Sequence, residues 1–304
     1  MLTKTHTDNR HLIFGFTLIV VSFVYWFIPG RPHLVLFNAL FYVGNILFFD
    51  ALSHNFSGFS LLKLKDRRRH FLILGLAFGL LLEFYFNWIG KFWYYPQWDI
   101  AYYAVIFVPG YAVYSFYLLE TYLGTKAVLE HFWRKRKASI SEKGWDKWFT
   151  ALGLTAAAGI GAITTWIIAS LPRRSLWETF QIYKARQGSL ENWYWFAVIA
   201  ILVWLLLEFL EYKKHETSLI YELARGNFWP LAALLLAAFV STVLYEVFNL
   251  PGGLWRYSYG NVPFENIKLF SFPILVYVGW PLHYLWAFSL YRLLFKKDTE
   301  KLWV

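Results

Sequence analysis

Two glutamates lie inside apolar stretches of the sequence, and each precedes an asparagine by one helical turn or less. These residues are Glu83 with Asn87 and Glu246 with Asn249. A carboxylate is costly in lipid, so such a residue usually faces an interior cavity, pairs with a base or stays protonated. A protonated acid in a water-poor pocket can add a proton to a carbon–carbon double bond. We predict that either glutamate is a catalytic acid oriented by its asparagine, with structural pairing to a nearby basic residue as the alternative.

Aromatic residues follow each acid at matching positions. When the two asparagines are aligned, Trp93 and Tyr95 match Trp255 and Tyr257. Aromatic faces stabilise a passing carbocation without attacking it, which suits an acid that protonates a double bond. We therefore predict that these four residues line a substrate site, together with His283 in the last apolar stretch. An interfacial aromatic belt and a satisfied core histidine are the structural alternatives.

Two acid–histidine pairs form a second set of candidates. Asp50 precedes His54, and Glu211 precedes His215, by four residues, which is one turn on the same helical face. Two such pairs on facing helices would supply oxygen and nitrogen ligands for a divalent metal. Acid–histidine contacts are also ordinary at solvated helix ends. We predict no bound metal and no cofactor, and keep these four residues as the metal candidates.

The composition indicates that much of this chain lies in lipid. Of the 304 residues, 58% are hydrophobic, 22% are aromatic and 16% are charged, whereas soluble domains average about 25% charged residues. This excludes a cytosolic globular enzyme and intrinsic disorder. The absence of cysteine excludes disulfides, thiolate metal sites and thiol catalysis. The sequence has no aspartate-rich prenyl-transfer motif, P-loop, G-x-S-x-G elbow or histidine-box set.

Eight apolar stretches reach or approach the length of about 20 residues that spans a membrane as a helix. They cover residues 12–29, 34–52, 70–89, 101–123, 148–171, 194–212, 228–249 and 269–294. They are continuous rather than alternating, so the sequence predicts an all-α polytopic membrane protein and not a barrel. The links after every second span and the two chain ends hold 21 of the 29 Lys and Arg residues. The positive-inside rule then predicts a protein of the cytoplasmic membrane with both termini cytoplasmic. It also explains the net charge of +10 without nucleic acid.

The chain reads as two tandem repeats of four helices, over residues 1–140 and 141–304. Besides the acid and aromatic patterns, Pro109 aligns with Pro273, and Asp50 and His54 align with Glu211 and His215. Because four is even, both repeats insert the same way. The sequence therefore predicts parallel repeats about an axis along the membrane normal.

The duplicated pattern of a glutamate, a glycine, W-x-Y and a proline-containing span resembles the lycopene cyclase domain proteins and the membrane carotenoid hydratases. The residues that carry this resemblance are Glu83, Gly90, Trp93, Tyr95 and Pro109, and then Glu246, Gly252, Trp255, Tyr257 and Pro273. The resemblance implies acid–base chemistry on the end of a polyene or isoprenoid chain without a redox cofactor. The proline–acidic–acidic motif of the cyclases has no counterpart around Pro109 or Pro273, which favours a separate branch of the group.

These patterns together predict an isoprenoid- or carotenoid-modifying membrane enzyme that cyclises or hydrates an apolar polyene chain. Membrane lipids and an apolar isoprenoid substrate are the expected partners, and the sequence leaves the oligomeric state open. The alternative is a non-enzymatic protein that binds or transports lipids or isoprenoids and uses the same acids to hold head groups or protons. A structural partner of another membrane enzyme is a third class.

Overall fold

The structure is a computed structural model of the 304-residue chain. It describes residues 9–25, 27–28, 34–64, 68–89, 92–95, 108–133, 144–170, 193–250, 255–257, 264, 266–270 and 272–295. Gly90 and Gly252, which belong to the duplicated pattern, lie outside these residues. So do the first residues of the fourth predicted span, 101–107.

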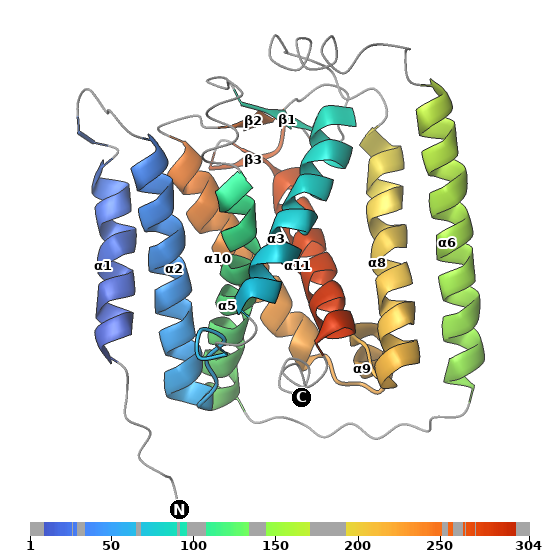
Figure 1. The fold of residues 1–304 in the computed structure, drawn as a ribbon, viewed down its shortest axis with the longest axis horizontal. Coiled ribbons are helices and arrows are strands. Elements are labelled where there is room, and N and C mark those ends of the chain that lie inside the picture. The colour runs from blue at the N-terminus through green and yellow to red at the C-terminus, as the bar shows by residue number, and fades with distance from the viewer. Residues whose placement is uncertain are drawn as a thin grey trace, which may run out of the picture. The chain divides into compact units, whose positions relative to one another are not determined.

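Long helices dominate the described residues, as the apolar stretches predicted (Figure 1). In chain order they are α1 (Asn9–Tyr25), α2 (Leu34–Ser57), α3 (Arg68–Leu82), α5 (Val108–Phe132), α6 (Trp145–Ser170), α8 (Trp193–His215), α10 (Trp229–Asn249) and α11 (Ile274–Leu294). A π-helix, η2 (Glu83–Ile89), continues α3, and the short helix α9 (Leu219–Ala224) follows α8. The all-α prediction is confirmed at this level.

Three helices of the described chain are long and apolar enough to cross a membrane by length and composition. They cover Trp145–Ala169, Tyr194–His215 and Trp229–Asn249. Two shorter apolar helices, Asn9–Tyr25 and Arg69–Leu82, accompany them. Many large apolar side chains are exposed, including Ile13 on α1 and Leu154 on α6. This surface is what a lipid-facing helix presents.

Two helices run further than their apolar stretches. α5 ends at Phe132 rather than near residue 123, and α2 ends at Ser57 rather than near residue 52. The polar extension of α5 stays helical because its residues are buried through Ala127 and because Lys126 pairs with Glu130 at 3.4 Å, one turn on. In α2, the Ser57 hydroxyl donates to the Ser53 carbonyl at 2.7 Å.

Four two-residue strands form two antiparallel pairs outside the helices. β1 (Trp93–Tyr94) pairs with β2 (Arg256–Tyr257), and β3 (Lys268–Leu269) pairs with β4 (Phe272–Pro273). The first ladder joins Trp93 to Tyr257 and Tyr94 to Arg256. This ladder therefore connects the two segments that carry the aromatic patterns. It pairs Tyr94 with Arg256, and the alignment of the two asparagines matches the same two residues.

The contacts divide the chain into two compact units. Unit 1 comprises residues 1–83, 95–134 and 236–255, and unit 2 comprises residues 84–94, 135–235 and 256–304. Each unit thus includes residues from both of the predicted repeats, 1–140 and 141–304.

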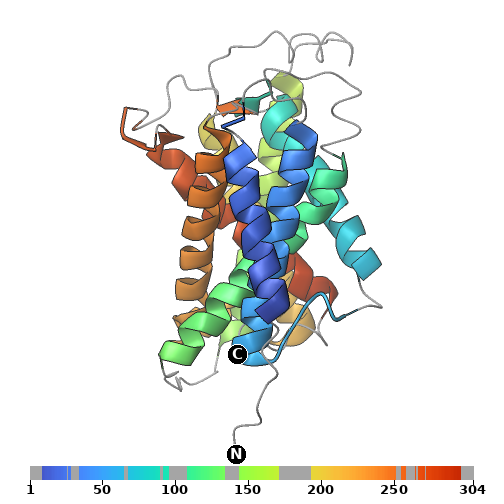
Figure 2. The ribbon, with the colours of Figure 1, turned by 90° about the vertical axis from the view of Figure 1, so that its left-hand side faces the viewer.

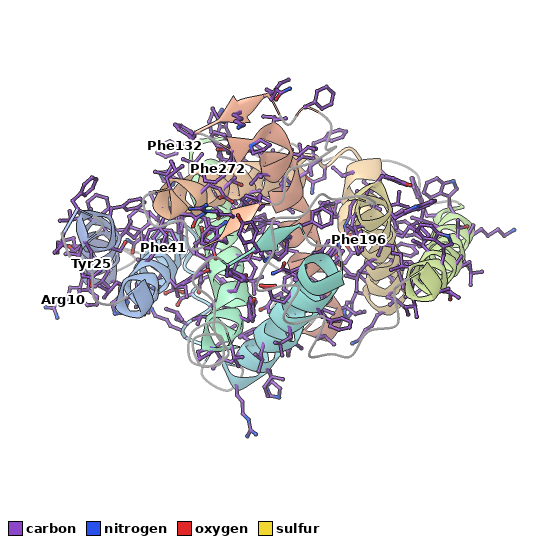
Figure 3. The ribbon with its side chains drawn as sticks, turned by 90° about the horizontal axis from the view of Figure 1, so that it is seen from above. Arg10, Tyr25, Phe41, Phe132, Phe196 and Phe272 are labelled. Carbon is purple, nitrogen blue, oxygen red and sulfur yellow. The ribbon has the colours of Figure 1, made fainter. Side chains whose placement is uncertain are left out.

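In unit 1, α2 packs against α1 and against α5, and α3 packs against α5 (Figures 1 and 2). α1 and α2 approach closely, since a Cβ at Gly15 would lie 2.8 Å from the Gly44 carbonyl oxygen. The core of this unit stacks Phe41 on Phe248 with ring centroids 4.2 Å apart, and the edge of Phe23 meets both rings. Phe41 is labelled in Figure 3.

In unit 2, α8 packs against α6 and α11. The core here consists of Ile167, Phe196 and Ile199, with Phe86 of η2 and Phe92 packed against it. Phe196 is labelled in Figure 3. Aromatic and branched side chains fill this core from helices far apart in the sequence, which is how a helix with a uniformly apolar surface buries its inner face.

Candidate active site

Glu83 stands where the α-helical α3 changes to a π-helix, and its side chain is 2% exposed. π-helical turns are rare and occur frequently at functional sites. The Tyr95 and Tyr111 hydroxyls both donate to Oε1 of Glu83. Tyr95 was predicted to line the substrate site, whereas Tyr111, in the first turn of α5, was not selected from the sequence. Two phenols on one carboxyl oxygen stabilise the anion that remains when the acid gives up its proton.

A glycine on α3 makes room for this arrangement. A Cβ at Gly79 would lie 2.4 Å from the Cβ and the ring of Tyr111. The Tyr111 ring therefore occupies the space that any side chain at this position would need. Gly79 is one turn before Glu83 on α3, so the same helix supplies both the acid and the gap for its partner.

An aromatic cluster surrounds the next turns of α5 in unit 1. Its members are Tyr42 of α2, Tyr114 and Tyr117 of α5, Tyr245 of α10, and Trp255. Tyr245 stacks on Trp255 at 4.5 Å, and Tyr42 meets the edge of Tyr117 at 5.6 Å. The Tyr42 and Tyr245 hydroxyls lie 2.5 Å apart. The cluster gathers aromatic rings and hydroxyl groups in one part of unit 1, and aromatic rings can stabilise transient positive charge on an apolar chain.

Both predicted acids belong to this unit. Glu246 follows Tyr245 on α10 and is fully buried. The Tyr245 hydroxyl interacts electrostatically with Glu246 and with Glu83. The two glutamates that sequence analysis selected therefore both lie within electrostatic range of Tyr245.

Asn249 holds the loop after α10. Its Nδ2 donates to the Trp255 carbonyl oxygen at 2.9 Å, and its Oδ1 accepts from the Trp255 amide at 3.2 Å. The asparagine thus fixes the backbone of Trp255 and, with it, the ring that stacks on Tyr245. This contact positions an aromatic residue of the cluster, a role that the sequence did not suggest for Asn249.

The other predicted site residues belong to unit 2. Asn87 is fully buried in the π-helix. Trp93 and Tyr257 face each other across the β1–β2 ladder, and the Tyr257 ring meets Phe272 at 6.1 Å. His283 packs on Trp280 at 5.6 Å within α11.

The four metal candidates have separate surroundings. Asp50 accepts from Ser60, and His54 Nε2 lies 2.8 Å from Lys63 Nζ. In unit 2, Glu211 forms a buried ion pair of 2.5 Å with Arg292, and His215 is 8% exposed. Across the described part of the chain, no three His, Cys, Asp or Glu side chains gather as a metal-binding group.

Sequence reasoning missed most of the tyrosines of the site. Tyr111, Tyr114 and Tyr117 recur every third residue on α5, and Glu120 continues the series. This spacing puts them along one ridge of a helix, so the signal was present in the sequence. The contribution of Tyr42 and Tyr245 depends on the packing of α2 and α10 and has no local signal.

Comparison of the chain with protein-family models, with curated proteins and with solved structures finds no match. The functional argument therefore rests on the residues and contacts of this chain.

Proposed function

We propose that this chain is an integral membrane protein of eight spans, built from two tandem parallel four-helix repeats, that modifies an apolar isoprenoid or polyene chain by acid–base chemistry. Three long apolar helices and the helices that match the other predicted stretches support the eight spans. The β1–β2 register supports the repeat, because a two-fold axis through an antiparallel ladder pairs each central residue with its own equivalent, as Tyr94 pairs with Arg256. The proposal includes the cytoplasmic membrane as location, cytoplasmic termini and no cofactor.

The observation that carries the enzymatic proposal is the Glu83 carboxyl group with its two tyrosine donors. In this proposal burial keeps Glu83 protonated before substrate binds, although two hydroxyls contact it. Glu83 then transfers its proton to one carbon of a terminal double bond, and the π electrons of that bond form the new C–H bond. A tertiary carbocation remains on the adjacent carbon. The Tyr95 and Tyr111 hydroxyls hold the Glu83 carboxylate that forms, so the site compensates charge that develops during the reaction.

The aromatic cluster then accommodates the cation. The ring centroids of Tyr117 and Tyr245 lie 6.3 Å apart, and those of Tyr245 and Trp255 lie 4.5 Å apart. Ring quadrupoles stabilise a cation without forming a bond to it. The cation is discharged in one of two ways. A neighbouring double bond attacks it and a carboxylate removes a proton, which gives a cyclic isomer, or water adds and loses a proton, which gives a tertiary alcohol.

Glu246 is the base that completes either route in this proposal. It is buried next to Tyr245, whose hydroxyl also interacts with Glu83. Glu83 donates the first proton, and Glu246 accepts the proton that is released later. Transfer of one proton from Glu246 back to Glu83 then restores the starting state. Two carboxyl groups with different surroundings are a common basis for dividing acid and base roles.

The test uses lycopene as the probe, in bacterial cells that accumulate it and express the chain. We expect new carotenoids with the mass of lycopene or of lycopene plus water, and we expect their loss in Glu83→Gln. Glu216→Gln, at an exposed position of unit 2, is the control and should retain the products. Bound but unchanged lycopene in the wild type would favour the non-enzymatic alternative, in which the same site binds or transports an isoprenoid. Neither product nor bound polyene would contradict both proposals.

A further inference from the structure

A carboxylate near the end of α2 holds the loop that follows the helix. Both carboxyl oxygens of Asp50 accept from the Ser60 hydroxyl, at 2.7 and 2.9 Å, and Oδ1 also accepts from the Leu62 amide at 3.2 Å. The Ser60 oxygen in turn accepts from the Lys63 amide at 3.3 Å. Asp50 thus joins α2 to residues 10 and 12 positions later, and Ser60 joins that loop to Lys63.

Unit 2 builds the same arrangement at the same spacing. Glu208 of α8 accepts from the Ile220 amide at 2.8 Å and from the Ser218 hydroxyl. The Ser218 oxygen accepts from the Tyr221 amide at 3.2 Å. The shared sequence pattern is an acid, nine residues, and then Ser-Leu-Leu or Ser-Leu-Ile, with the leucine fully buried in both units. By these hydrogen bonds, Glu208 is the equivalent of Asp50. The sequence alignment had matched Asp50 with Glu211, three residues later.

The two arrangements differ in the side chain that the fourth helix of each half adds. In unit 2, the Ser289 hydroxyl of α11 donates to Glu208 at 2.7 Å. In unit 1, Glu120 of α5 lies within hydrogen-bonding reach of Asp50. Glu120 is fully buried, and the Leu62 amide, which donates to Asp50 Oδ1, also approaches its carboxyl group. Neither Glu120 oxygen has a well-formed hydrogen bond to a donor of the described chain. A hydroxyl donor in one unit is therefore replaced by a second carboxyl group in the other.

A second unpartnered acceptor lies on the helix that faces Glu120. The Nδ2 group of Asn45 donates to the Phe41 carbonyl at 2.8 Å, which leaves Oδ1 buried and without a donor among the described residues. Asn45 lies on α2 between Phe41, whose ring meets Tyr117, and Phe49, whose carbonyl approaches Gly124. This face therefore points at the stretch of α5 that contains Glu120. Asn45 therefore adds a buried acceptor to the face of α2 that packs against α5.

The charged groups of the surrounding elements are engaged elsewhere or exposed. On α2 and its loop, His54 lies 2.8 Å from Lys63, and on α5 Lys126 pairs with Glu130 at 3.4 Å. Among the side chains that the structure describes on α1, α3 and the end of α5, the other basic ones are exposed: Arg10, His11, Arg69, His70 and His131. Two buried carboxyl groups in contact cannot both ionise without a compensating cation.

We infer that Asp50 and Glu120 form a proton-binding carboxyl pair, in which Glu120 carries the proton and donates it to the Asp50 carboxylate. Asp50 is the anion because Ser60 and Leu62 already donate to it. Protonated Glu120 then donates a hydrogen bond to Asp50, as the Ser289 hydroxyl donates to Glu208 in unit 2. Serine is a permanent donor and glutamic acid is a titratable one, so unit 1 binds and releases a proton where unit 2 has a fixed contact. This inference is independent of the proposed enzymatic function.

Infrared spectroscopy of the purified protein near neutral pH tests the pair directly, through the carbonyl stretch of a protonated carboxyl group. We expect the wild-type minus Glu120→Gln difference spectrum to contain one such band. The glutamine amide can still donate to Asp50, so this variant keeps the contact and loses only the proton. Glu208→Gln is the matched control, and its difference spectrum should lack the band because Glu208 already receives donors as a carboxylate. A Glu120 band that is absent, or equal to that of Glu208, would overturn the inference.

A second measurement covers the case in which the glutamine variant does not fold. Glu120→Ser copies the donor of unit 2 and should also lack the band. In the wild type itself, the band should disappear as the pH is raised, with the release of one proton to water. Because the folded pair binds a proton that an unfolded chain does not hold near neutral pH, the stability of the wild type should fall along the same titration, and that of the variant should not. A wild-type spectrum without a titrating band would contradict the proposal by itself.

Discussion

Removal of the Tyr111 hydroxyl is the most specific perturbation of the proposed acid. Tyr111→Phe keeps the ring that fills the space beside Gly79 and deletes one of the two donors to Glu83 Oε1. If the hydroxyl stabilises the carboxylate that forms as the proton leaves, the lost hydrogen bond weakens the transition state more than the ground state. The variant should therefore fold normally and turn over slowly.

The size of the effect follows from the strength of a hydrogen bond to a charged group. Such bonds contribute about 1.5–3 kcal/mol, and each 1.36 kcal/mol changes a rate by about tenfold. Turnover should fall by about 10- to 150-fold in Tyr111→Phe. Tyr95→Phe should have an effect of similar size, because Tyr95 donates to the same oxygen. The double variant should deviate from additivity, since the remaining hydroxyl adjusts when its competitor is removed.

The assay is the initial rate of product formation from lycopene, measured by chromatography in membranes with equal amounts of protein. Tyr277→Phe is the matched control, because it deletes a tyrosine hydroxyl that donates to the Leu269 carbonyl at 2.9 Å in unit 2. Its rate should stay within about twofold of the wild type, the size of effect expected for a surface substitution. Wild-type turnover in Tyr111→Phe would refute the role of this hydroxyl in the acid chemistry.

Three further predictions concern packing and charge. Gly79→Val should displace the Tyr111 ring and reduce turnover at least as much as Tyr111→Phe, and a fully active variant would contradict the tight fit seen at 2.4 Å. Phe41→Ala should lower the free energy of unfolding by about 3–5 kcal/mol in a denaturant titration in detergent, because it empties a fully buried ring site; a change below about 1 kcal/mol would mean that the site collapses. Arg292→Met should destabilise the fold by about 3–5 kcal/mol because it leaves Glu211 buried without its cation. Adding Glu211→Leu to this variant should recover most of the lost stability. Additive losses in the double variant would show that the ion pair is not the cause.

Most of the helices could be predicted because their signal is local. An apolar run of about 20 residues is sufficient evidence for a helix in lipid, and a long helix overlaps each of the predicted stretches. Their polar ends could not be predicted in the same way. α5 continues past residue 123 because burial and the Lys126–Glu130 pair hold the extension, and burial of polar residues depends on neighbouring helices.

The candidate site could be predicted only in part. The spacing of Glu83 and Tyr95 lies within one helix end and its loop, so a short-range pattern was enough to select both. Tyr42 and Tyr245 lie 203 residues apart in the sequence and meet only through helix packing. The π-helical turn at Glu83 also had no evident signal, since its residues are as apolar and aromatic as those of an ordinary helix end.

The alignment of the two halves illustrates a different limit. The acid–histidine spacing suggested that Asp50 corresponds to Glu211, whereas the hydrogen bonds match Asp50 with Glu208. In both units, the acid accepts from a backbone amide 12 residues later, and this contact determines which acids correspond. Every residue except proline has a backbone amide, so the sequence alone could not identify this contact. The Ser-Leu pair that accompanies it was visible but short.

The measurement that tests the central claim most directly is mass spectrometry of the small molecules that copurify with the protein in mild detergent. The account predicts a bound polyene or other isoprenoid in the wild type, and a changed ratio of substrate to product in Glu83→Gln, because the aromatic cluster still binds the chain while the acid is gone. Bulk phospholipid alone, in both proteins, would contradict the claim that this site accepts an isoprenoid.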